Sequence, residues 1–222
     1  MTLKRREFIN LSALAATAGL VIGVSAYTSI AEGKEKQPGP DQLHSMANDV
    51  FPITTEEREA RITKAQKLMA EQNIQALILD AGTTLKYFTG IGWWPSERTM
   101  VAIIPAKGTP IYVCPGFEES RFRELIKIGK DVYAWQEDES PYKLITVALK
   151  DAGIVSGKIG MEERLRFFFF DGVRQVAPQI EFVNGTSITM ACRMIKSAAE
   201  LALMQKANDI TSAAIKFSIG QL

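Results

Sequence analysis

Apolar and polar positions alternate regularly from residue 54 onward, and the alternation predicts helices and strands in turn. Thr54 and Glu57 form a capping box, in which each side chain covers a free amide of the first helical turn. The helix that follows to Gln72 has its apolar residues on one face: Ile62, Ala65, Leu68 and Met69. The chain therefore enters this region through an amphipathic helix.

Short apolar runs predict the strands. Residues 76–79 form a continuous apolar run, as expected of a strand that is covered on both faces. Further strands are predicted over residues 100–104, 111–113, 131–135, 158–161 and 180–183, with a hairpin-type loop over 105–110. Helical spacing is found over residues 117–128, 142–152 and 167–176. This order predicts one α/β domain with helices on the faces of its sheet.

The end of the chain has a different pattern. Ser197 and Glu200 form a second capping box, which opens a helix that runs nearly to Leu222. Its apolar residues recur at steps of four and three: Leu203, Ala207, Ile210, Ala214 and Phe217. Such a stripe is covered either by the sheet or by a second domain or chain, and the pattern alone leaves both open.

The pattern of residues 1–31 predicts an export signal. A basic head with Arg5 and Arg6 precedes a weakly apolar run and small residues that favour cleavage after Ala26, with residues 29–31 as a second candidate site. Paired arginines ahead of an apolar run resemble the twin-arginine signal. The run has about 14 residues, short of the roughly 20 that span a bilayer, although an uncleaved anchor or a buried helix is the alternative. We expect a periplasmic or otherwise extracytoplasmic protein that meets the membrane only transiently, with residues 32–53 as a flexible linker.

Composition and charge exclude several classes of protein. Lys and Arg number 26 against 25 Asp and Glu, a net charge of +1, so no nucleic-acid partner is expected. Two cysteines exclude a disulfide-stapled fold, and Cys114 and Cys192 are predicted to be separate buried thiols rather than a bridge. The one histidine, His44, lies in the linker without neighbouring ligands, so no metal site is predicted around it.

Aromatic residues and carboxylates supply the remaining candidates. Trp93 and Trp94 form either an exposed lid or contact patch, or a pair of which one or both pack beneath the loop. Arg98 is a candidate for binding a substrate carboxylate, or else pairs on the surface with Glu97 or Glu119.

Two further groups are assigned structural roles. Glu162 and Glu163 are adjacent in an extended segment and point to opposite faces, which favours a structural role over acid–base work. The phenylalanines of residues 167–170 cover every face of one helical turn, so they are predicted to fill the core on one side and to meet a partner on the other.

Several short motifs together resemble a known family. Tyr87-Phe88-Thr89-Gly90, after a buried strand and before the two tryptophans, resembles the signature loop of the creatinase/prolidase N-terminal domain. The strand, Lys-Gly loop, strand and Glu-rich helix that follow, up to residue 121, keep the order of that family. Arg193-Met194-Ile195-Lys196-Ser197 resembles the junction with the "pita-bread" metallopeptidase domain of Xaa-Pro aminopeptidases and prolidases. The resemblance extends over roughly residues 54–217.

The resemblance implies a single α/β domain with a mixed β-sheet flanked by helices over residues 54–196. Residues 197–222 would then be the first helix of a metallopeptidase domain that is otherwise missing. In full-length relatives that domain holds two divalent metals, Mn, Co or Zn, on two aspartates, a histidine and two glutamates. Glu200 and Asp209 are the only acids after Ser197, so we assign no catalytic residue, metal ligand or cofactor to this chain and expect it to be inactive alone.

The function implied is that of the substrate-access and dimerisation domain of an exported Xaa-Pro aminopeptidase or prolidase-type metallopeptidase. Tyr87, Trp93, Trp94 and Arg98 are its substrate-access candidates. The expected partners are a second copy, or a catalytic domain or chain on the C-terminal helix, with a peptide substrate in the full-length form. The alternatives are a stand-alone exported binding module without catalysis, and the same domain of a creatinase-like amidinohydrolase.

Overall fold

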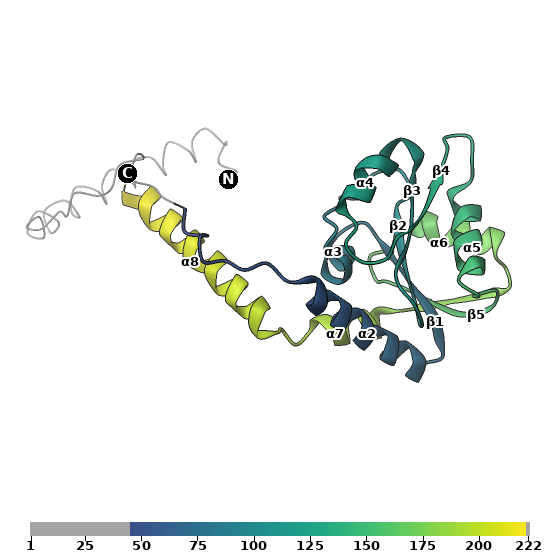
Figure 1. Cartoon of the computed structure of the whole chain (residues 1–222), viewed down its shortest axis with the longest axis horizontal. Helices are drawn as coiled ribbons and strands as arrows, with labels where there is room; N and C mark the ends of the chain where they lie inside the picture. Colours follow the sequence, from purple (N-terminus) through teal and green to yellow (C-terminus); the bar gives the residue numbers. More distant parts are fainter. Residues whose placement is uncertain (1–44, 221–222) are drawn as a thin grey trace, which may run out of the picture. The chain divides into compact units, whose positions relative to one another are not determined.

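The computed structural model describes residues 45–220, and six strands of this part form one mixed sheet (Figure 1). The strands are β1 (Ile74–Asp80), β2 (Val101–Pro105), β3 (Ile111–Pro115), β4 (Asp131–Trp135), β5 (Gly157–Met161) and β6 (Ile180–Asn184). Their order in the sheet is β4-β3-β2-β1-β5-β6. Strand β2 is antiparallel to β1 and β3, whereas the other three pairs are parallel. The predicted mixed sheet is confirmed.

Helices cover both faces of this sheet. They are α2 (Thr55–Glu71), α3 (Thr83–Thr89), α4 (Glu119–Leu125), α5 (Pro141–Asp151), α6 (Phe167–Val176) and α7 (Thr186–Arg193). The last helix, α8 (Ala198–Gly220), has no buried residue and belongs to neither face. The buried residues of α2, α3, α4 and α7 join one core cluster, and those of α5 and α6 join the other. Figure 1 shows α3 and α4 on one side of the strands, and α5 and α6 on the opposite side.

Strand β1 is the centre of the domain and is buried on both faces, as its continuous apolar run predicts. Leu77 and Leu79 pack into the cluster under α2 and α3, while Ala76 and Ile78 pack into the cluster under α5 and α6. The central strand therefore separates two cores, and its carboxyl end emerges between them.

Both predicted helix starts are found, with one difference. At α8 the box is complete, because the Glu200 amide donates to Ser197 Oγ at 3.2 Å and the Ser197 amide to Glu200 Oε2 at 2.9 Å. At α2 the Glu57 amide donates to Thr54 Oγ1 at 3.2 Å. The Glu57 carboxylate does not return to Thr54, because it binds Arg61 and Ser197 instead.

Two local predictions are wrong, and one short helix has no predicted counterpart. The expected loop at Tyr87-Phe88-Thr89-Gly90 is the last turn of helix α3, which ends at Gly90 in the left-handed conformation (φ 83°). The helix expected over residues 117–128 is a 3₁₀ turn, Gly116–Glu118, followed by α4, and it ends early because Ile126 is extended. Helix α7 was not predicted at all. These segments have about two turns or fewer, too short for a periodic pattern to register.

The described residues divide into two units, the domain Phe51–Met204 and a smaller unit of residues 45–50 with residues 205–220. In the smaller unit, Lys206 Nζ binds the Asp49 carboxylate at 2.8 Å. On the predicted stripe of α8, Leu203 and Phe217 are partly buried, whereas Ala207, Ile210 and Ala214 are exposed. What covers the stripe stays a prediction.

The export prediction lies outside the described residues, since Arg5, Arg6, Ala26 and His44 all precede residue 45. In the part that is described, no helix combines the length and apolarity needed to cross a membrane. Cys114 and Cys192 are free and buried, as predicted. Burial raises the pKa of the Cys114 thiol to about 12, so this thiol stays protonated and unreactive at neutral pH.

Candidate functional site

The carboxyl edge of the sheet contains a topological switch point. Strands β1 and β5 are parallel neighbours, yet the helices that follow them, α3 and α6, pack on opposite faces of the sheet. Two chain segments that diverge in this way leave a crevice outside the strand ends, which is where open α/β sheets bind their ligands. The crevice is the candidate site of this domain.

Asp80, the last residue of β1, is held across this crevice by Arg166. Arg166 Nε donates to Asp80 Oδ2 at 2.8 Å, and Nη2 donates to Oδ1 at 3.0 Å. The third guanidinium nitrogen donates to the Ser96 carbonyl oxygen, and the guanidinium also lies over the Phe168 ring at 4.8 Å. This bidentate pair joins β1, the start of α6 and the loop before β2 into one rigid edge.

Glu162 follows β5 and is buried beside the ion pair. Its Oε1 accepts the Asp80 amide at 2.6 Å. Burial raises the pKa of the Glu162 carboxyl to about 7, and the nearby Glu163 and Asp80 carboxylates add to this. Glu163 has other partners, the Thr189 hydroxyl at 2.9 Å and Arg193 at 3.8 Å. The two glutamates therefore face different surroundings and do not form an acid–base pair.

A cavity of about 390 Å³ opens at this point, and we refer to it as the switch-point cleft. Its walls come from the β1–α3 loop, the β5–α6 loop and the segment before β2: Asp80, Ala81, Gly82, Thr83, Thr84, Trp94, Pro95, Glu162, Arg164 and Arg166. Gly82 has φ of 137°, a conformation that side chains rarely adopt, and no atom lies within 4 Å of the position of a Cβ there. The backbone at Gly82 thus faces open space.

The two adjacent tryptophans have different environments. Trp93 packs edge-on against Phe122 at 5.4 Å between ring centroids, under the guanidinium of Arg121. Trp94 is 85% exposed and belongs to the wall of the switch-point cleft. Trp93 is thus a packing residue, whereas Trp94 is an exposed wall residue of the cleft.

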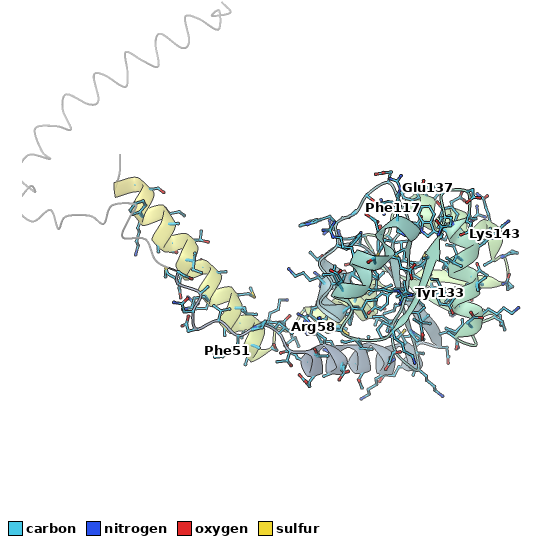
Figure 2. The ribbon with its side chains drawn as sticks, turned by 45° about the horizontal axis from the view of Figure 1, so that its top comes forward. Phe51, Arg58, Phe117, Tyr133, Glu137 and Lys143 are labelled. Carbon is cyan, nitrogen blue, oxygen red and sulfur yellow. The ribbon has the colours of Figure 1, made fainter. Side chains whose placement is uncertain are left out.

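Arg98 lies outside the walls of the switch-point cleft. Its Nε binds the Glu137 carboxylate at 3.0 Å, its Nη1 binds Glu97, and its guanidinium lies over the Phe117 ring at 5.0 Å. Figure 2 shows Phe117 and Glu137 together at one end of the domain. The structure therefore has the surface ion pair with Glu97, whereas Glu119 pairs with Arg123.

Tyr87 belongs to the contact between α3 and α7. Its hydroxyl donates to the Cys192 carbonyl oxygen at 2.8 Å, and the Arg61 guanidinium lies over its ring at 4.1 Å. Burial raises the pKa of the Tyr87 phenol, so the phenol stays a donor. One side of Tyr87 borders a second hollow of about 410 Å³, with Thr83, Met190, Arg193, Met194, Lys196 and Glu200.

Of the four access candidates, only Trp94 is a wall residue of the switch-point cleft. Sequence reasoning missed Asp80, Arg164 and Arg166. A charged residue directly after the apolar run 76–79 is a usable signal for Asp80, because a buried charge needs a partner. No sequence signal joins Asp80 to Arg166, which lies 86 positions further on.

Among residues 45–220, no three His, Cys, Asp or Glu side chains are grouped so that they could hold a metal ion. The described residues thus do not fit a two-metal centre, which needs several oxygen ligands around metals about 3.5–4 Å apart.

Comparison with known proteins identifies the family. The family model of the creatinase/prolidase N-terminal domain matches residues 61–195, and the chain belongs to this family. An uncharacterized peptidase of Schizosaccharomyces pombe is 31% identical over 188 residues, which cover 77% of this chain and 40% of that protein. Ectoine hydrolase of Halomonas elongata is 24% identical over 173 residues, 73% of this chain and 43% of the relative.

A solved prolidase structure has a similar fold. A crystal structure of prolidase from Thermococcus sibiricus superposes with a TM-score of 0.67 at 20% identity, over 77% of this chain and 45% of that one. At this identity the likeness concerns the fold alone. The chain spans less than half the length of the curated relatives it matches.

Proposed function

We propose that this chain provides the substrate-access and dimerisation domain of an exported Xaa-Pro aminopeptidase or prolidase-type metallopeptidase. In this proposal the metal-binding half lies outside these 222 residues and brings two divalent ions, Mn, Co or Zn. The observation that carries it is the family match over residues 61–195, in a chain that aligns with 40% of a peptidase and 45% of a prolidase. The remaining length of such relatives leaves room for a catalytic domain.

The access role is supported by the carboxyl edge of the sheet. Trp94 offers a large, rigid and 85% exposed surface there. Its position is held, because Arg166 ties the neighbouring Ser96 carbonyl to Asp80. An aromatic side chain on a fixed loop is suited to contact a peptide that enters an adjoining active site.

The dimerisation role is supported by the aromatic surface of α6. Phe167 is 75% and Phe168 is 39% exposed, whereas Phe169 is fully buried in the core. Exposed phenylalanines that continue from a core favour a protein partner over water. A second copy of the chain is the partner that we propose.

The intact mass of the native protein from the exported fraction of its own cells tests the proposal. A mass roughly twice the 24.5 kDa of this chain supports a single-chain peptidase whose first half is seen here. A mass near that of residues 27–222 contradicts the single-chain form. The catalytic half would then belong to a separate chain, or the protein would be a binding module.

A further inference from the structure

We propose that the switch-point cleft binds an organic anion, whose carboxylate meets Arg164 and whose apolar part packs on Trp94. The ligand class is a carboxylate joined to an apolar group. The proposal goes beyond the access role, because it assigns a binding site to this domain itself and needs no catalytic domain.

The position and size of the cleft suit a ligand. It lies outside the carboxyl ends of β1 and β5, where the chain turns to opposite faces of the sheet. Its volume of about 390 Å³ is within the range of small-molecule sites. The open backbone at Gly82 leaves the β1–α3 side accessible, since nothing fills the space in which a side chain would stand.

One guanidinium of the cleft has no partner among residues 45–220. Asp80 and Arg166 neutralise each other in their bidentate pair. Glu162 is buried against the Asp80 amide, and burial raises the pKa of its carboxyl to about 7, so its negative charge is weakened near neutrality. Arg164 is exposed at the wall, with no hydrogen-bond or ion-pair partner anywhere in residues 45–220. The unpaired group is thus a guanidinium, which binds carboxylates in a bidentate manner.

The apolar part of the ligand follows from Trp94 and Pro95. Both line the cleft, and the indole of Trp94 is 85% exposed although Trp93 beside it is packed. An exposed indole next to a free guanidinium favours a ligand with an apolar group close to its charge over a bare inorganic anion.

A titration of the purified 222-residue chain tests this pairing of charge and apolar surface. The two probes are N-acetyl-L-leucine and N-acetyl-L-leucinamide, which differ only in the carboxylate, with calorimetry and tryptophan fluorescence as readouts. We expect the acid to bind at least about tenfold more tightly than the amide, the usual size of one charge-assisted hydrogen bond. Equal affinities, or no binding of the acid up to its solubility, would overturn the proposal.

Variants assign the binding to the residues. Arg164→Gln should weaken binding of the acid about tenfold, whereas Arg164→Lys should keep part of the affinity. Arg123→Gln is the matched control, because Arg123 is an exposed arginine on α4 that pairs with Glu119. Trp94→Phe should retain binding by calorimetry and lose most of the fluorescence change. An unchanged affinity in Arg164→Gln, with the folded state verified by circular dichroism, would contradict the site.

Discussion

Two neighbouring buried carboxyl groups at the carboxyl edge of the sheet, Asp80 and Glu162, differ in how their negative charge is compensated. Asp80 is nearly inaccessible, with 3% of its side chain exposed, and a bidentate arginine compensates its charge. Glu162 has a backbone amide but no arginine in its hydrogen bonds. Its raised pKa is the consequence, since a buried carboxyl without a cation avoids ionisation.

This difference predicts how stability depends on pH. The pKa of the Glu162 carboxyl is about 7 in the fold, whereas the ordinary pKa of a glutamate is 4.5, so the folded state holds one more proton between these limits. Stability from this group is therefore complete below pH 4.5 and is lost as pH rises to 7, by about 3 kcal/mol. Glu162→Gln, which keeps an acceptor for the Asp80 amide, should flatten this fall and be more stable than the wild type at pH 8.

Urea denaturation across this pH range measures the effect. Glu124→Gln is the control, because Glu124 is an exposed carboxylate on α4 and is not among the groups that shift the pKa of Glu162. A Glu162→Gln profile as steep as that of the wild type would show that ionisation of Glu162 is not opposed by the fold.

At the scale of elements, the junction between the first and last helices of the domain depends on one arginine. Arg61 on α2 is 8% exposed and binds Glu57 at 2.7 Å and Glu200 of α8 at 3.3 Å. It also donates to the Tyr87 carbonyl oxygen of α3 at 2.9 Å. The capping box at Ser197 starts α8, but Arg61 attaches that start to α2 and α3.

Replacing Arg61 should lower the free energy of unfolding. In Arg61→Leu the Glu57 and Glu200 carboxylates stay close together without a cation, so we expect a loss of about 3 kcal/mol in the free energy of unfolding. Arg174→Leu is the control, because its pair with Asp171 is exposed, and such pairs contribute less than about 1 kcal/mol. Similar losses in the two variants, measured by urea denaturation, would mean that the Arg61 contacts stabilise the fold no more than an exposed ion pair does.

For the chain as a whole, we expect no catalysis by the purified protein. The purified chain should hydrolyse no Xaa-Pro dipeptide with Mn²⁺, Co²⁺ or Zn²⁺ added, because two-metal hydrolysis needs a cluster of oxygen ligands that residues 45–220 do not form. Release of proline is the measurement, with a blank preparation from cells that lack the chain as the control. Turnover clearly above the blank would contradict the placement of the metal site outside this chain.

We also expect export to depend on the paired arginines. Arg5→Lys combined with Arg6→Lys should remove the protein from the exported fraction, because the paired arginines are the recognised feature of the twin-arginine signal. Lys4→Arg, which conserves charge outside the pair, is the control and should leave export unchanged. Immunoblotting of exported and cytoplasmic fractions gives the readout, and normal export of the double variant would exclude this route.

Local periodicity alone determined most of the elements. The bounds of β4 and α6 agree with the predicted residues 131–135 and 167–176, and the capping box at Ser197 is complete. These features depend on residues within a few positions of one another, so their pattern is visible in the chain. The two-turn helix α3 is not visible in the sequence pattern, because it is stabilised by the packing of Leu85 and Phe88 into the core.

Only the tertiary structure decided which residues meet. The strand order placed β1 beside β5, and this brought Asp80 to Arg166 and Glu162 to the Asp80 amide. Tertiary packing also partly buried one tryptophan of an adjacent pair, Trp93, and left Trp94 exposed. The physical reason is that strand pairing joins segments more than 80 positions apart, whereas the alternation of apolar and polar residues specifies only which side of each element faces a core.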